Sequence, residues 1–280
     1  MKDYLRIILI LVGLFTLISC IYSVISIENI HIEQFNNRIN ELPENKISII
    51  IPSVYRKDKN YINETLSELY KQKQPSTKLN IFIHIGDHKK TKTNVNANSK
   101  NDIAFYIHDK FKRNSNINIL KTYKEEYGNL LNKHTYKKGK DYMFWRSKQN
   151  LDYYFAITKT LSRTNAPYIL FLEDDQKAVH NWDMEINKNI ESMETNNKIC
   201  HTKMSPLGMC AYLYNSTHMR DFANYMKDKY DKNPCDWLIN HFVREKSLKI
   251  KKAPKYVFQH EGDVSSLVNK TQMLKVKNLN

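Results

Sequence analysis

Three consecutive acidic residues, Glu173-Asp174-Asp175, are the part of this sequence best suited to chemistry. They directly follow the apolar run 168–172, which has the length and composition of a buried strand. Ligands of open α/β sheets bind at the carboxyl ends of strands, and carboxylates crowded there repel one another unless a cation neutralises them. Their oxygens suit Mg²⁺ or Mn²⁺, which can hold a diphosphate leaving group. A solvated acidic turn that caps the next helix is the alternative.

Two residues far along the chain could complete such a site. His260 follows a second apolar stretch, and its imidazole could be a further metal ligand, although a lone histidine is more often structural. Asp236 stands just before a predicted helix. Its carboxylate could take a proton from a sugar hydroxyl, or it could cap the helix, and the two roles are compatible.

Further candidates follow the first two predicted strands or share one face of a predicted helix. The positions at the ends of the first and second strands, where a nucleotide would bind, are Pro52, Ser53, Arg56 and Asp87. On the helix expected over residues 144–161, the spacing i, i+3, i+4, i+7 belongs to Arg146, Gln149, Asn150 and Tyr153. This face could contact a phosphate or a uridine, and an ordinary solvated face would show the same pattern. The opposite, apolar side is expected to carry Leu151, Tyr154, Phe155 and Leu161.

The elements that must position these residues alternate between strands and helices. Apolar, β-branched runs predict strands at 46–52, 79–87, 117–120, 168–172, 209–214 and 256–260. Helical periodicity predicts helices around 62–70, 101–112, 144–161, from Trp182 onward, 216–230 and 237–246. The Lys- and Asn-rich segments 88–100 and 122–141 are expected to be irregular. The opening order of strand, helix and strand predicts an α/β fold with a mostly parallel sheet.

The N-terminal segment predicts a membrane anchor. Residues 7–27 carry no charge and are long enough to span a bilayer, with Lys2 and Arg6 before them. We therefore expect a cytosolic tail at 1–6, a transmembrane helix at 7–27, a stem at 28–45 and one lumenal domain at 46–280. A cleaved signal peptide is the rival interpretation, but its apolar core is usually shorter.

Charge and cysteine content bear on which partners and metals the chain is expected to bind. The formal net charge of the 280 residues is +15, but the Lys excess is spread along the chain, which favours a solvated surface and no nucleic-acid partner. The four cysteines are Cys20 in the expected span and Cys200, Cys210 and Cys235 beyond it. The last three allow one disulfide and one free thiol. No CxxC pair occurs, so a zinc site built on cysteine is not expected.

Four ordered stretches resemble the catalytic domain of the alpha-1,3-mannosyl-glycoprotein 4-beta-N-acetylglucosaminyltransferases. They are residues 146–153, 172–175, 236–241 and 258–267, and the resemblance runs over about 46–268. It implies a GT-A, Rossmann-like fold in a single-pass type II Golgi membrane protein. It also implies an inverting transfer of N-acetylglucosamine from UDP-N-acetylglucosamine to a mannose hydroxyl of a glycoprotein N-glycan, forming the beta-1,4 branch on the alpha-1,3 arm.

The same resemblance assigns roles to the candidates. The acidic triplet would bind Mn²⁺, or Mg²⁺, through Asp175 together with Glu173 or Asp174. His260 would be a metal ligand, and Asp236 would be the catalytic base.

Two alternatives stay open beside this assignment. The chain could transfer another sugar or modify a glycolipid anchor, because family members carry a C-terminal lectin-like domain that these 280 residues are expected to lack. It could also be a non-catalytic sugar-binding protein, which the presence of the triplet, Asp236 and His260 disfavours.

Overall fold

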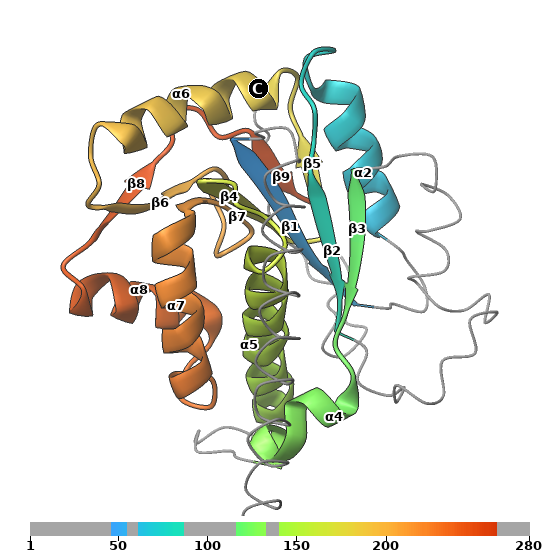
Figure 1. The fold of residues 1–280 in the computed structure, drawn as a ribbon, viewed down its shortest axis with the longest axis vertical. Helices are drawn as coiled ribbons and strands as arrows, with labels where there is room; N and C mark the ends of the chain where they lie inside the picture. Colours follow the sequence, from blue (N-terminus) through green and yellow to red (C-terminus); the bar gives the residue numbers. More distant parts are fainter. Residues whose placement is uncertain (1–45, 55–60, 87–115, 133–139, 262–280) are drawn as a thin grey trace, which may run out of the picture. The chain divides into compact units, whose positions relative to one another are not determined.

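The computed structural model describes residues 46–54, 61–86, 116–132 and 140–261 (Figure 1). The predicted membrane span 7–27, the stem 28–45, the segment 88–100 and the helix 101–112 lie outside these ranges. Within the described ranges, no helix is both long and apolar enough to cross a bilayer.

A seven-stranded sheet with the order β3-β2-β1-β4-β7-β6-β8 forms the centre of this domain. Its strands are β1 (Ile47–Ser53), β2 (Ile81–Ile85), β3 (Ile117–Lys121), β4 (Tyr168–Leu172), β6 (Ile199–Lys203), β7 (Ala211–Asn215) and β8 (Lys249–Lys252). Strands β3, β2, β1 and β4 are parallel, β7 is antiparallel to both β4 and β6, and β8 is parallel to β6. The prediction of a mostly parallel α/β sheet is therefore confirmed.

Helices cover both faces of this sheet (Figure 1). On one face, α2 (Tyr61–Gln72) and α6 (Trp182–Glu194) pack on strand residues that include Ile49 and Ile51. On the other, α5 (Lys140–Leu161), α7 (Ser216–Lys229) and α8 (Cys235–Glu245) pack on residues that include Ile50. Because both faces are covered, the central strands β1 and β4 consist mainly of apolar residues, and all of β4 is buried.

A second, two-stranded sheet pairs β5 (Gln176–Ala178) with β9 (Phe258–His260) in antiparallel register. Strand β5 directly follows the acidic triplet, and strand β9 ends at His260. This small sheet therefore connects the end of β4 to a segment more than 80 residues further along the chain.

Some elements differ from the sequence predictions. The segment 122–141, expected to be irregular, contains α4 (Lys124–Tyr127) and the 3₁₀ helix η2 (Gly128–Asn132), and α5 begins within it. Strands β5, β6 and β8 were not predicted. The sequence of β8, Lys-Ile-Lys-Lys, has the lysines typical of an edge strand in place of an apolar run.

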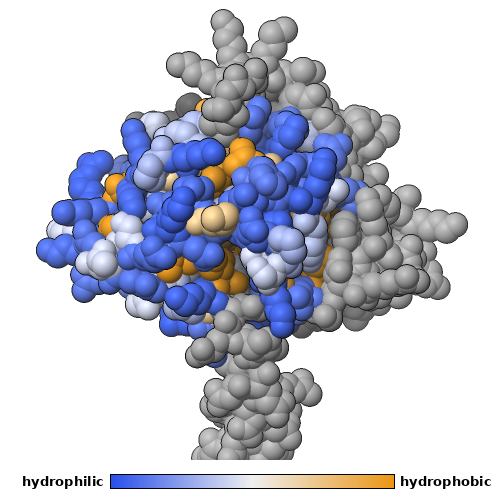
Figure 2. Space-filling model, turned by 90° about the horizontal axis from the view of Figure 1, so that it is seen from above, coloured by the Kyte–Doolittle hydropathy of each residue, from blue (hydrophilic) through white to orange (hydrophobic). Residues whose placement is uncertain are grey.

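The surface of the described domain is largely hydrophilic on the side drawn in Figure 2, with apolar side chains showing only in places. The large apolar residues with the most exposure among the described residues are Phe144, Met184, Leu207 and Trp237. Of these, Trp237 is the most exposed, at 54%.

Candidate functional site

Asp174 turns inward at the end of β4. Strands β1 and β4 are parallel neighbours, so their carboxyl ends meet, and Ser53 Oγ donates a 2.7 Å hydrogen bond to Asp174 Oδ2. The hydroxyl of Thr65 on α2 donates to the Asp174 carbonyl at 2.8 Å and accepts from the Gln176 amide at 3.1 Å. Asp174 is only 3% exposed. These contacts give Asp174 a role in fixing the turn that carries its two acidic neighbours.

Asp175 and Glu173 both approach His260. Gln176 pairs with His260 in the small sheet, and the Glu261 amide donates to the Asp175 carbonyl at 3.0 Å. This pairing places His260 Nε2 3.2 Å from Asp175 Oδ2 and 3.9 Å from Glu173 Oε2. Both carboxylates thus lie beside the same imidazole nitrogen, and carboxylate oxygens together with an imidazole nitrogen are a donor set that fits a divalent cation such as Mn²⁺.

The carboxylate of Glu173 lies in a partly buried setting. Burial raises its pKa above the ordinary 4.5, and the nearby charge of Asp175 raises it further. His260 and hydrogen bonds from Cys210 and Tyr153 oppose that rise, and the Tyr153 hydroxyl donates to Glu173 Oε1 at 2.9 Å. A bound cation would remove the repulsion between Glu173 and Asp175.

A chain of hydrogen bonds links this carboxylate to the predicted polar residues of α5. Arg146 Nη1 donates to Gln149 Oε1 at 3.0 Å, and Gln149 Nε2 donates to the Tyr153 hydroxyl at 3.2 Å. Tyr153 then reaches Glu173. The structure thus brings Arg146 and Gln149 to the edge of the site, with the Arg146 guanidinium 4.4 Å from the centre of the Trp145 ring.

Asn150 and Tyr153, which share the predicted polar face of α5, are both buried, so the alternative of an ordinary solvated face does not hold for them. The cause is the packing of α7, α8 and the loop between them against this side of α5. Asn150 Nδ2 donates to the carbonyls of Tyr230 at 2.7 Å and Asn233 at 2.8 Å. Asn150 therefore holds the loop that leads into α8.

Asp236 lies in the first turn of α8 and does not cap it. The helix begins at Cys235, and its N-cap is Pro234, which forms no side-chain capping bond. The Oδ1 atom of Asp236 is buried without a hydrogen-bond partner among the described residues. An acidic group at this position is favoured by the helix dipole, and an oxygen with no protein partner can accept a proton.

Asp236 belongs to the same electrostatic neighbourhood as Glu173. Burial raises the pKa of the Cys235 thiol to about 12, with further contributions from the charges of Asp236 and Glu173. Burial also raises the pKa of Tyr212, where Cys210, Cys235, Asp236 and Glu173 add to the effect. The charges of Asp236, in the first turn of α8, and of Glu173, at the end of β4, therefore both raise the pKa values of Cys235 and Tyr212.

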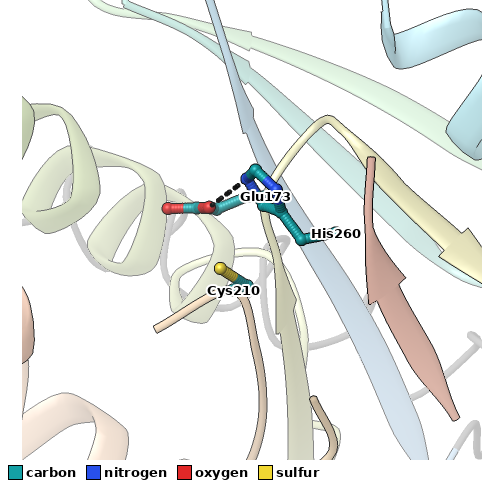
Figure 3. A group of neighbouring side chains, drawn as sticks. All are labelled: Glu173, Cys210 and His260. Carbon is teal, nitrogen blue, oxygen red and sulfur yellow. Dashed lines mark ion pairs between the residues drawn. The ribbon is translucent and has the colours of Figure 1, made fainter. Parts of the chain in front are cut away.

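Cys210 is the residue of this site that sequence reasoning missed. It immediately precedes β7, and because Leu172 pairs with Ala211, Cys210 lies opposite Glu173, whose amide donates to the Cys210 carbonyl at 2.9 Å. Its thiol lies beside Glu173 and His260 (Figure 3). The proximity of Cys210 to Glu173 follows only from the pairing of β4 with β7, and the local sequence around Cys210 does not predict that pairing. Cys200, Cys210 and Cys235 are all free thiols, so none forms the disulfide that their number allowed.

The remaining sequence candidates are placed as follows. Pro52 lies in β1, opposite His84 of β2, and is partly buried. Arg56 and Asp87 lie outside the described residues, as do the last residues of the stretch 258–267.

Comparisons with known proteins place the chain among glycosyltransferase sequences. Residues 33–279 match the family model described as the MGAT4 conserved region. The chain is 29% identical over 238 residues to alpha-1,3-mannosyl-glycoprotein 4-beta-N-acetylglucosaminyltransferase C of Macaca fascicularis, covering 82% of this chain and 47% of the relative. It is 30% identical over 248 residues to the A form of Xenopus tropicalis, covering 80% and 44% respectively. The chain thus spans about half the length of the curated relatives it matches.

Solved structures give looser matches. Residues 1–349 of S. aureus TarS in complex with UDP-GlcNAc match with a TM-score of 0.43 and 16% identity, covering 76% of this chain and 58% of that chain. The mannosyltransferase PcManGT from Pyrobaculum calidifontis, in complex with GDP-Man and Mn2+, matches with a TM-score of 0.44 and 10% identity, covering 79% and 61%. Likenesses this loose bear no weight on function. The family match over 33–279, by contrast, covers most of the sequence, and this chain belongs to the family described as the MGAT4 conserved region.

Proposed function

We propose that this chain is a membrane-anchored glycosyltransferase of GT-A fold. It would transfer N-acetylglucosamine with inversion from UDP-N-acetylglucosamine to a mannose hydroxyl of a glycoprotein N-glycan, forming the beta-1,4 branch on the alpha-1,3 arm. The observation that carries this proposal is the approach of Glu173 and Asp175 to the same nitrogen of His260 at the carboxyl end of β4, in a member of this family. The matched relatives are named as N-acetylglucosaminyltransferases.

The donor half of the proposed site lies at the end of β4. Asp175, His260 and Glu173 would hold Mn²⁺, or Mg²⁺, whose positive charge stabilises the departing diphosphate. Ser53 and Asp174 keep the turn in place through their 2.7 Å hydrogen bond. The remaining proposed nucleotide contacts are Pro52, Arg56, Asp87, Arg146 and Gln149.

The acceptor half centres on Asp236. Its Oδ1 would accept the proton of the acceptor hydroxyl while that oxygen forms a bond to the anomeric carbon of the donor sugar. The bond from that carbon to the diphosphate breaks on the opposite face, so UDP leaves with the bonding electrons and the configuration inverts. The exposed ring of the next residue, Trp237, offers an apolar surface for the acceptor sugar.

The proposed location follows from the N-terminal sequence. An uncharged span at 7–27 behind Lys2 and Arg6 supports a single-pass type II anchor that places residues 46–280 in the Golgi lumen, where N-glycans are available.

A transfer assay on the purified 280-residue chain in detergent tests the proposal. Each of several UDP-sugars is incubated with Mn²⁺ and with an N-glycan, a glycolipid anchor or no acceptor, and UDP release and product mass are measured. We expect product only from UDP-N-acetylglucosamine and the N-glycan. Product from another pair would replace the proposed donor or acceptor. Sugar binding by a folded chain without transfer from any donor would indicate a non-catalytic protein.

A further inference from the structure

The side chains of Glu173, Cys210 and His260 bring three different ligand types together beside the proposed donor site (Figure 3). We propose that they form a Zn²⁺ site, and that zinc bound there competes with the cation required for transfer. The competition rests on the proposed function, whereas zinc binding itself does not.

The spacing of the ligand atoms suits a tetrahedral ion. One atom from each of the three side chains lies within 4.8 Å of the others, and His260 Nε2 is 3.9 Å from Glu173 Oε2. Ligands of a tetrahedral zinc site lie roughly 3.3–3.8 Å apart, as follows from Zn–S and Zn–N bonds of about 2.3 and 2.0 Å. Contraction by about 1 Å, within reach of side-chain rotation, would therefore close the site around the ion.

The types of ligand select zinc over manganese. A thiolate, an imidazole and a carboxylate form a mixed set that Zn²⁺ binds well, whereas Mn²⁺ prefers oxygen ligands. Asp175, 3.2 Å from the same His260 nitrogen, supplies the oxygen-rich alternative. The same imidazole ring thus has a carboxylate neighbour suited to a hard cation and a thiol neighbour suited to a softer one.

The surrounding fold supports the three ligands and leaves a path for the ion. The pairing of β4 with β7 fixes Cys210 opposite Glu173. The Tyr153 hydroxyl donates a hydrogen bond to Glu173 Oε1 and so orients the carboxylate of Glu173. Such supporting hydrogen bonds orient metal ligands. The side chains of Glu173 and His260 remain 24% and 12% exposed, so an ion can reach them from solvent.

Zinc binding would transfer the Cys210 thiol proton to solvent as the Zn–S bond forms, and three protein ligands would leave a fourth position for water. Because Glu173 and His260 belong to both arrangements, zinc in this site would exclude the cation that binds the donor diphosphate.

Cobalt reports directly on this site. The purified 280-residue chain, without nucleotide or acceptor, is titrated with Co²⁺ and followed by absorption, since cobalt bound to a thiolate has a charge-transfer band in the near ultraviolet. We expect the band in the wild-type chain and its loss when Zn²⁺ displaces cobalt. Cys210→Ala should abolish the band and weaken zinc binding by about tenfold or more, since even groups that only support a ligand contribute about 10–100-fold.

Cys200→Ala is the matched control, because it removes another buried thiol, from β6, and should leave the band unchanged. Cys210→Ser, with circular dichroism on every variant, distinguishes ligand loss from misfolding. A wild-type chain without the band, or a band that survives in folded Cys210→Ala or Cys210→Ser, would overturn the proposal. Because no sugar donor is present, failed transfer in the other assay leaves this result untouched.

Discussion

The hydroxyl of Ser53 donates a 2.7 Å hydrogen bond to the carboxylate of Asp174, joining the ends of two parallel strands that are 121 residues apart in the chain. This contact distinguishes Asp174 from the other two residues of the acidic triplet. Asp174 is buried beneath the turn, while Glu173 and Asp175 both approach His260. Asp174, expected from sequence to be a ligand candidate, is thus better suited to hold its neighbours in place.

Ser53→Ala should destabilise the domain by about 2 kcal/mol, because it leaves a buried carboxylate without a charge-assisted hydrogen bond. Urea unfolding measures the change. Ser147→Ala is the matched control, since its hydroxyl is equally buried and has no hydrogen-bond partner among the described residues. Equal stability losses in the two variants would show that the Ser53–Asp174 bond contributes nothing specific.

Glu173→Gln should stabilise the metal-free protein at neutral pH. Burial and Asp175 raise the pKa of Glu173 above 4.5, so the folded state holds its proton more tightly than the unfolded state. Its favourable contribution is therefore complete below pH 4.5 and is lost as pH rises through the folded pKa. Each pKa unit amounts to about 1.4 kcal/mol, and about 1 kcal/mol shifts the Tm of a domain this size by roughly 2–4 °C.

Thermal unfolding in chelator, repeated from acidic to neutral pH, checks this prediction. The Tm advantage of Glu173→Gln should vanish toward pH 4.5. Glu191→Gln, which removes an exposed carboxylate from α6, should stay near the wild-type Tm. A variant less stable than wild type at neutral pH would contradict the destabilising role of the Glu173 charge.

Strands β1, β2 and β4 of the parallel half of the fold were predictable because they are buried on both faces. The apolar runs of β1, β2 and β4 are visible in sequence, and polar residues stand at the carboxyl ends of β1 and β4, at the same sheet edge. Strand β8 was not predictable, because its four residues include three lysines and its pairing with β6 comes from tertiary contacts.

Within the site, residue type was enough to identify candidate ligands, whereas their spatial neighbours could be identified only from the strand pairing. Asp175 and His260 were recognisable as ligand types that follow apolar runs, and the β5–β9 register then brings them together. Cys210 gave no such signal, since its proximity to Glu173 depends on the antiparallel β4–β7 register. The burial of Asn150 could not be predicted from its position on α5, because a buried amide that donates to two carbonyls has the same helical spacing as a solvated one.

Asn150→Ala should destabilise the domain by about 2–3 kcal/mol, because the carbonyls of Tyr230 and Asn233 would lose their buried donor. Chemical unfolding measures this loss. Gln149→Ala, one position away on the less buried side of α5, should cost clearly less. Similar losses in both variants would argue against a structural role specific to Asn150.

Asp236→Asn should lower the transfer rate by about 10²–10⁴-fold, the usual contribution of a general base, while Mn²⁺-dependent UDP binding remains. The substitution keeps the shape of the side chain and removes its capacity to accept the acceptor proton. Single-turnover transfer and calorimetric UDP binding separate the two effects. Asp228→Asn, an exposed acidic residue on α7, serves as control. Wild-type turnover in Asp236→Asn would remove this residue from the base role.

Trp237→Ala should raise the KM for the acceptor by about tenfold, the equivalent of about 1.4 kcal/mol, while donor binding stays within the error of the assay. Trp237 is 54% exposed and follows Asp236 directly, and packing its ring against the apolar face of a sugar would remove apolar surface of both from water. Met184→Ala is the matched control, because Met184 is an exposed apolar residue at 46% and lies on α6. Steady-state kinetics with the acceptor varied at saturating donor distinguish a KM effect from a kcat effect. If Trp237→Ala and Met184→Ala share the wild-type KM, the acceptor sugar does not bind against Trp237, and the acceptor half of the site must lie elsewhere around Asp236.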